Sequence, residues 1–198
     1  MTKLTRDMWI ELGVEVLRTE GFSALKADKL AKRGGVTRGS FYGYFENLDA
    51  YLNQVFEWWL GQSKAVAGEL GSLADPQAQL LHLIKTAASS DIALERAMRA
   101  WAHGDAKINR RVSEIDSFRI NVLRGVIAKI THDNESARSK AKTLYASAIG
   151  LAFLPHDQLP ITDQDINVLM YGAITLEAHA ADGAQSASRS LPDGGELK

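Results

Sequence analysis

The chain has 198 residues, of which 45% are hydrophobic and 24% are charged, and its formal net charge is −1. A chain of this length buries about 70% of its unfolded surface, so it can form a core without disulfides or a structural metal. It has no cysteine, no signal-peptide pattern and no apolar run of about 18 residues, so we expect a cytoplasmic protein that does not span a membrane. The near-neutral charge also excludes a protein that coats nucleic acid over its whole surface.

The chain begins with a predicted helix over residues 4–19. Apolar residues recur there at helical spacing, and Gly21 stands where a helix C-terminus is expected. Phe22 follows, and we expect its ring to fill the core of a small three-helix unit. The residues of this helix expected to face inward are Trp9, Leu12, Gly13, Val16 and Leu17.

Two short helices follow with a sharp turn between them. The first covers residues 26–33 with Leu25, Leu30 and Ala31 as its inner stripe, and Gly34-Gly35 ends it. The second begins at Thr37, a good N-cap residue, and we expect Val36, Phe41 and Phe45 to turn inward. This spacing is typical of a helix-turn-helix.

The outer face of this turn and second helix is suited to a nucleic-acid backbone. Residues 22–45 contain five basic side chains and one acidic one, and the exposed face carries hydroxyl groups. Gly39 and Gly43 are costly in a helix interior, which favours close approach of the backbone to a partner. Arg38 is the expected main base reader and Lys26 the strongest phosphate candidate, although the lysines can also be solvated charges. The predicted DNA-binding set is Lys26, Thr37, Arg38, Gly39, Ser40, Tyr42 and Tyr44.

Further helices account for most of the remaining chain. A long fourth helix begins after an N-cap at Asn47 and continues to about residue 70, where Gly71-Ser72 breaks the pattern. Later helices are expected at about 76–89, 91–102, 106–130, 134–153 and 162–182. Residues 183–198 are rich in Ser, Gly, Ala and charge, so we expect a disordered tail.

Residues 5–60 resemble the TetR family of bacterial transcriptional regulators. The resemblance lies in the run from Gly35 to Phe45 and in the acidic, leucine-containing helix start that follows it. It implies an all-α fold, in which a three-helix DNA-binding domain (1–46) is joined by the long fourth helix to a helical ligand-binding and dimerisation domain (47–182). Many members carry a small hydroxyl residue at Lys26 and histidine at Tyr44. Both changes keep a phosphate-binding group, so they affect the operator sequence more than DNA binding.

The last two predicted helices are candidates for subunit contact. Small residues recur along the first of them, including Ala137, Ala141 and Ala148, and allow close helix packing. The resemblance implies a homodimer through about residues 134–154 and 162–182, and the alternative is an ordinary intramolecular core. Two helix-turn-helix units on a two-fold axis would read a pseudo-palindromic operator in double-stranded DNA.

The resemblance also implies a small-molecule pocket in the second domain. Its aromatic candidates are Trp59, Trp101, Phe118, Tyr145 and Tyr171. The alternative for each is a place in the core, and this alternative is favoured for Trp101, which stands near a helix boundary common in the family. The expected ligand is small and partly hydrophobic.

Motifs for other chemistry are absent from the sequence. It has no His-Glu-x-x-His, no phosphate-binding Gly-x-x-x-x-Gly-Lys loop and no Gly-x-Ser-x-Gly, so we expect no metal, no cofactor and no catalytic residue. With the resemblance, the sequence predicts a homodimeric repressor, not an enzyme, that a small-molecule ligand releases from its operator. The alternatives are a DNA-binding regulator with no such ligand, controlled by a partner protein, and an enzyme with an appended helix-turn-helix.

Overall fold

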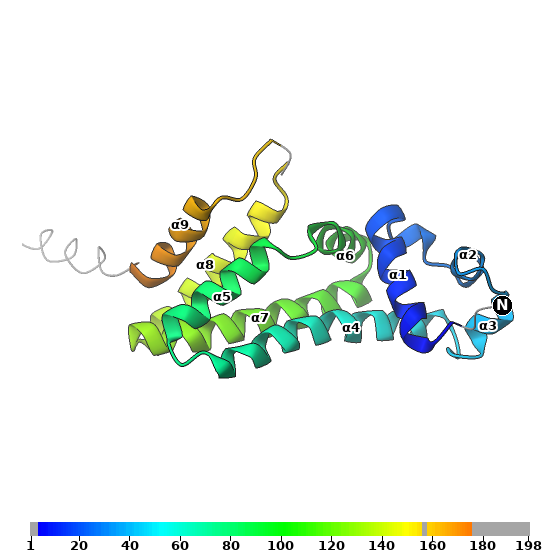
Figure 1. Cartoon of the computed structure of the whole chain (residues 1–198), viewed down its shortest axis with the longest axis horizontal. Coiled ribbons are helices and arrows are strands. Elements are labelled where there is room, and N and C mark those ends of the chain that lie inside the picture. The colour runs from blue at the N-terminus through cyan, green and yellow to red at the C-terminus, as the bar shows by residue number, and fades with distance from the viewer. Residues whose placement is uncertain (1–3, 156–157, 176–198) are drawn as a thin grey trace, which may run out of the picture.

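The computed structural model describes residues 4–155 and 158–175, and these residues form helices without any strand (Figure 1). The helices are α1 Arg6–Glu20, α2 Ala27–Arg33, α3 Arg38–Tyr42, α4 Leu48–Glu69, α5 Pro76–Ala88, α6 Ile92–Gly104, α7 Ala106–Thr131, α8 Asn134–Ala152 and α9 Asp163–Thr175, with 3-10 turns at Phe22–Ala24 and Leu70–Ser72. The all-α prediction is confirmed. The predicted tail 183–198 and the predicted helix end at 176–182 lie outside the described residues.

The molecule is elongated, with α1, α2 and α3 gathered at one end. Helices α4 and α7 run lengthwise from near that end, while α5, α8 and α9 lie at the other end (Figure 1). Helix α6 stands between the two groups. The long helix α4 therefore connects the helix-turn-helix end to the rest of the protein, as predicted.

Side-chain caps explain where several helices begin. Asn47 Oδ1 accepts a hydrogen bond from the amide of Ala50 at 2.8 Å, which confirms the predicted start of α4. Asp75 caps α5, and Pro76 occupies its first turn. Helix α1 begins two residues later than predicted because the hydroxyl of Thr5 accepts the amide of Met8 and makes Thr5 the N-cap.

Aromatic rings fill the core of the three-helix unit. Trp9, Leu30 and Phe41 are fully buried. The rings of Trp9 and Phe41 meet edge to face with centroids 5.5 Å apart, and Phe45 packs on Phe41 at 5.1 Å. The inward prediction for Phe41 and Phe45 is confirmed, and Val36 packs against the same core while partly exposed.

Helix α1 buries more of its surface than its predicted apolar stripe. It packs on α2, α4 and α6, so Ile10 and Val14 are buried in addition to Trp9, Val16 and Leu17. Leu12, which was expected inside, is only partly buried. A helix covered on several sides does not follow a single stripe.

The crossing of α1 and α4 depends on a glycine. A Cβ at Gly13 would lie 1.7 Å from Tyr51 Oη, and that phenol donates a hydrogen bond to the carbonyl oxygen of Trp9 at 2.9 Å. Burial raises the pKa of Tyr51. Gly13 therefore makes room for a buried, hydrogen-bonded ring between the two helices.

The prediction that Phe22 fills the three-helix core is wrong. Its side chain is 42% exposed and stacks on Trp101 of α6, with ring centroids 4.2 Å apart and planes 15° apart. The 3-10 turn after Gly21 buries Ala24 and Leu25 in its place. Phe22 thus forms a contact between the helix-turn-helix end and α6.

Hydrophobic packing continues across the predicted domain boundary at residues 46 and 47. One cluster of buried residues joins α1–α3 to the first half of α4, α6 and the start of α7. A second cluster joins α5, the second half of α7, α8 and α9. Arg18 and Asp91 form an ion pair across this boundary. The boundary stays a prediction, and the packing does not break there.

Candidate DNA interface and ligand cavity

The turn between α2 and α3 is tight because Gly35 adopts a positive φ of 66°. The amide of Val36 then donates to the carbonyl of Ala31 at 3.0 Å, which ties the turn to α2. The short helix α3 consequently presents one face to the core and the other to solvent. This is the arrangement in which a helix-turn-helix reads DNA.

The solvent face of α3 carries most of the predicted DNA-binding residues. Thr37, Arg38, Gly39 and Tyr42 are exposed and Ser40 is partly exposed. Arg38 Nη2 donates to Tyr42 Oη at 3.3 Å, and its guanidinium lies 5.5 Å from the centre of that ring. This hydrogen bond raises the pKa of Arg38. Arg38 and Tyr42 therefore form a pair on the exposed face.

The start of α3 also leaves groups open to an outside partner. Thr37 occupies the N-cap position, as predicted, but within the described residues its hydroxyl makes no capping hydrogen bond. A Cβ at Gly39 would meet only Thr37 Oγ1, at 3.8 Å, so packing inside the protein does not require glycine there. Both observations are compatible with a phosphate or base edge at this face.

The remaining two predicted residues have different surroundings. Lys26 is exposed at the N-cap of α2. Tyr44 is partly buried against Phe45, and Arg6 Nη2 donates to the carbonyl oxygen of Tyr44 at 2.8 Å. Sequence reasoning did not single out Arg6, because its closeness to Tyr44 arises only from the fold. The roles of Lys26 and Tyr44 on DNA stay predictions.

A cavity of about 540 Å³ lies between α4, α5, α6, α7 and α8. Its wall is mainly apolar and includes Trp58, Leu83, Val122 and Leu144. Of the five aromatic candidates, Trp59, Phe118 and Tyr145 line this cavity. The long amphipathic helices thus leave space between them.

Trp101 and Tyr171 do not line the cavity. Trp101 is 5% exposed and is enclosed by Phe22 and Phe56, so it belongs to the core at the junction. Tyr171 is 68% exposed on α9. Sequence patterns identify both as large rings on helices, but they do not show which side of a bundle each ring faces.

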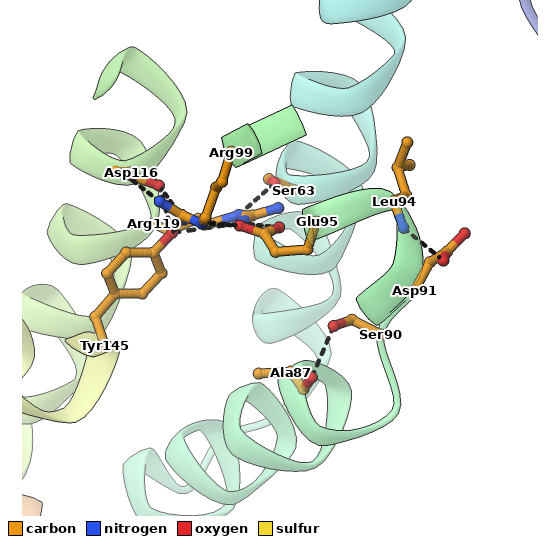
Figure 2. Close-up of polar contacts among 10 residues, drawn as sticks. All are labelled: Ser63, Ala87, Ser90, Asp91, Leu94, Glu95, Arg99, Asp116, Arg119 and Tyr145. Carbon is orange, nitrogen blue, oxygen red and sulfur yellow. Dashed lines mark hydrogen bonds and ion pairs between the residues drawn. The ribbon is translucent and has the colours of Figure 1, made fainter. Parts of the chain in front are cut away.

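The cavity also borders a polar cluster, which we define as Ser63, Glu95, Arg99, Asp116, Arg119 and Tyr145 (Figure 2). Arg119 Nη1 donates to Glu95 Oε2 at 3.0 Å, and its Nε donates to Ser63 Oγ at 2.9 Å. Arg99 donates two hydrogen bonds to the carboxylate of Asp116, at 2.8 and 3.1 Å. Side chains from α4, α6, α7 and α8 therefore meet at one point.

Tyr145 completes the polar cluster. Its phenol donates to Asp116 Oδ1 at 2.6 Å and accepts from Arg99 at 3.1 Å and Arg119 at 3.3 Å. Burial raises the pKa of Tyr145 to about 12. Burial by itself lowers the pKa of Arg119, but Glu95 and Tyr145 raise it above its ordinary value. The cluster is thus charge-balanced, with two carboxylates and two guanidinium groups.

Sequence reasoning missed Arg18 and Asp91, which also line the cavity. Arg18 Nε donates to Asp91 Oδ2 at 2.7 Å, and Asp91 Oδ1 accepts the amide of Leu94 as the cap of α6. Arg18 belongs to α1. A residue of the helix-turn-helix end therefore contributes to the cavity wall, and only the packing of α1 on α6 brings it there.

The described residues contain neither a cluster of metal-binding side chains nor a helix that could span a membrane. In residues 4–155 and 158–175 no three His, Asp or Glu side chains gather as a metal site would require. The helices within those ranges are all too short or too polar to cross a bilayer.

The helix-turn-helix and its exposed polar face define the class as a DNA-binding regulator, and a cavity lies between its other helices. Residues 10–55 match the family model described as "Bacterial regulatory proteins, tetR family". Residues 10–55 thus form a DNA-binding unit of the TetR-family type. This match covers the three-helix unit and the beginning of α4.

Relatives of known description agree with this assignment. The "Fatty acid metabolism regulator protein" of Bacillus subtilis (strain 168) is 25% identical over 130 residues, which are 61% of this chain and 64% of that regulator, less than two thirds of its length. The structure of the transcriptional regulator FadR from Bacillus subtilis in complex with stearoyl-CoA aligns with a TM-score of 0.68 and 18% identity. That alignment covers 88% of this chain and 100% of FadR.

A transcriptional regulator from Rhodococcus sp. Rha1 has the same fold. It aligns with a TM-score of 0.70 and 18% identity over 86% of this chain and 94% of the regulator. At such identities the structural matches establish the fold alone. The proteins named here are described as regulators.

Proposed function

We propose that this protein is a homodimeric repressor that binds a pseudo-palindromic operator and is released by a small, partly hydrophobic ligand. The observation that carries the DNA-binding part is the solvent face of α3, where Arg38 and Tyr42 lie exposed beside the hydroxyl of Thr37. Arginine reads guanine and the hydroxyl groups contact phosphates. A repressor acts where its operator DNA is, so the proposed location is the cytoplasm.

Exposed apolar side chains on α9 and on the segment between α8 and α9 support a homodimer. These large hydrophobic residues are 39–68% exposed: Phe153, Leu154, Leu159, Val168 and Tyr171. Their burial against a second copy would remove this apolar surface from water. This region overlaps the predicted dimer segments, 134–154 and 162–182.

The cavity supports control by a ligand. Its volume of about 540 Å³ falls within the range of about 300–1,000 Å³ usual for small-molecule sites. FadR from Bacillus subtilis, which shares the fold, was solved with stearoyl-CoA. We therefore propose a ligand with a long apolar part. The cavity favours this mode of control over regulation by a partner protein alone.

Two routes would connect the cavity to the DNA-binding face. Helix α4 carries Trp59 and Ser63 on the cavity wall and begins three residues after Phe45, which packs beneath α3. Arg18 of α1 lines the cavity and holds Asp91 at the start of α6. A ligand that shifts either helix would change the spacing of two DNA-binding ends. A coupling of about 1–3 kcal/mol would weaken DNA binding roughly 5- to 150-fold.

The proposed function can be tested by selecting genomic fragments that bind the purified protein and sequencing them. We expect a pseudo-palindromic motif. On that motif, Arg38→Ala should relax base preference at one position in each half-site, while Lys26→Ala should weaken specific and random DNA alike and lower the salt slope by about 1. Failure to enrich any motif would contradict the proposal. Equal effects of the two variants would contradict the assigned roles.

A further inference from the structure

The charges around the cavity are already paired. Five charged residues line it, and each has a partner: Arg18 pairs with Asp91, Glu95 pairs with Arg119, and Glu69 is hydrogen-bonded to His82. A charged ligand would therefore find neither an open cation nor an open anion on the wall. Burying a charge without a partner is strongly unfavourable.

The polar cluster uses most of its hydrogen-bonding groups internally, but within the described residues two donors on the cavity wall stay free. A tyrosine hydroxyl offers one donor and two acceptor positions, and Tyr145 uses all three on Asp116, Arg99 and Arg119. Both carboxylates accept from arginine. Among the residues that the structure describes, the hydroxyl of Ser63 only accepts, from Arg119 Nε, and Arg119 Nη2 makes no hydrogen bond.

The donors still available belong to residues on the cavity wall. Ser63 and Arg119 both line the cavity, and Arg119 lies over Trp59 with its guanidinium carbon 5.1 Å from the ring centre. The contact with this ring and the hydrogen bond to Ser63 (Figure 2) hold the guanidinium in position. A neutral acceptor group on a ligand would therefore meet these two free donors at this part of the wall without adding charge.

We propose that the cavity selects an uncharged, elongated ligand whose hydrogen-bond acceptor, such as an ester or ketone carbonyl, meets Ser63 and Arg119. Ligands with the same carbon chain that end in a free carboxylate or an amine are rejected, because the charges of the polar cluster already balance one another. This inference rests on the proposed function and adds the chemical class of the ligand. It also identifies Glu95 as the specificity determinant, because Glu95 neutralises both Arg99 and Arg119.

The experiment compares three probes with the same carbon chain: methyl decanoate, decanoate and decylamine. Trp58 and Trp59 line the cavity, so quenching of tryptophan fluorescence reports occupancy, and calorimetry gives the dissociation constants. We expect the ester to bind at least about tenfold more tightly than the acid or the amine. An acid or amine that binds as tightly as the ester would overturn the inference while leaving the cavity as a ligand site.

Glu95→Gln is the decisive variant. It leaves Arg119 without its carboxylate partner, so decanoate affinity should rise about tenfold while ester affinity changes less than about threefold. Glu11→Gln, an exposed carboxylate on α1, is the matched control and should change neither. If Glu95→Gln does not fold, the wild-type comparison and Ser63→Ala, which should weaken only the ester, still decide.

Absence of binding by all three probes would overturn both the inference and the ligand part of the proposed function. Operator binding, measured in the same preparation without probe, is independent of this result. Failure of the ligand inference can therefore be distinguished from failure of the proposed DNA binding.

Discussion

At the scale of single residues, Phe41 and Tyr42 show how adjacent aromatic rings serve different purposes. Phe41 is fully buried and contacts the rings of Trp9, Phe45 and Tyr51. Tyr42 is 44% exposed and holds Arg38. The helical step of about 100° between neighbours turns one ring toward the core and the other toward solvent.

Substitution of the two rings should therefore separate stability from DNA binding. Phe41→Ala should lower the free energy of unfolding by about 3–5 kcal/mol, because it leaves a cavity among packed rings. Tyr42→Ala should change stability by less than about 0.5 kcal/mol and weaken operator binding. Urea denaturation and DNA titration measure the two effects, and a large stability loss in Tyr42→Ala would contradict the assignment.

Tyr145 gives the protein a dependence on alkaline pH. Its pKa in the folded state is raised to about 12 from 10.0, mainly by burial. Between these values the folded state keeps a proton that the unfolded state loses, so stability is present below pH 10 and falls as pH rises toward about 12. Tyr145→Phe should reduce the decrease of the urea unfolding midpoint between pH 10 and about 12. Tyr42→Phe, which removes the hydroxyl of an exposed ring, should leave this decrease unchanged. An unchanged slope in Tyr145→Phe would exclude Tyr145 as its source.

At the scale of helices, close contact between α1 and α4 determines how the DNA-binding end attaches to the rest. Gly13 leaves space for Tyr51, whose hydroxyl binds the backbone of Trp9. Phe22 on Trp101 and Arg18 on Asp91 attach the same end to α6. Helix α6 therefore shares contacts with both the DNA-binding end and the cavity.

Two glycine substitutions in helices should act in opposite directions. Gly13→Ala places a methyl group against the buried Tyr51 ring and should destabilise the protein by about 1–3 kcal/mol. Gly61→Ala, in α4 where a Cβ meets nothing within 4 Å, should stabilise it by about 0.5–1 kcal/mol, because alanine has the higher helix propensity. Thermal unfolding measures both changes in stability. Equal shifts of the unfolding temperature in the two variants would show that the contact with Tyr51 does not exclude a larger residue at position 13.

At the scale of the whole molecule, α9, which carries the exposed apolar residues Val168 and Tyr171, lies toward the end opposite to α3 (Figure 1). Pairing of two copies there would leave both DNA-binding faces free. The proposed dimer thus uses the length of the molecule to separate two half-site contacts.

A charge in this region should dissociate the dimer. Val168 is 61% exposed, so Val168→Lys should leave the fold intact and shift sedimentation toward the monomer, because the lysine would be desolvated in the interface. Affinity for a two-half-site operator should fall, while contact with one half-site persists. Asn53→Lys, an exposed site on α4, is the control. A dimer that tolerates Val168→Lys would place the interface elsewhere.

The sequence by itself determined the helices and the solvent-exposed face of α3 on which the DNA contacts are proposed. Glycines, N-cap residues and helical periodicity act over a few residues, so they predicted the turn at Gly35, the cap at Asn47 and the burial of Phe41. The match of residues 10–55 to the family follows from the same local features. The sequence also predicted that Trp59, Phe118 and Tyr145 would share a site, by resemblance rather than by periodicity, and all three line the cavity.

Only the tertiary structure decided which faces of those helices meet. It placed Phe22 on Trp101 rather than in the three-helix core, and it left Tyr171 outside the cavity. It also joined Glu95 with Arg119 and Arg18 with Asp91. Periodicity reports that a helix has an inner face, whereas charge balance in a cavity depends on contacts between residues distant in sequence. The DNA-binding face is therefore a local property of the chain, and the character of the ligand site is a property of its packing.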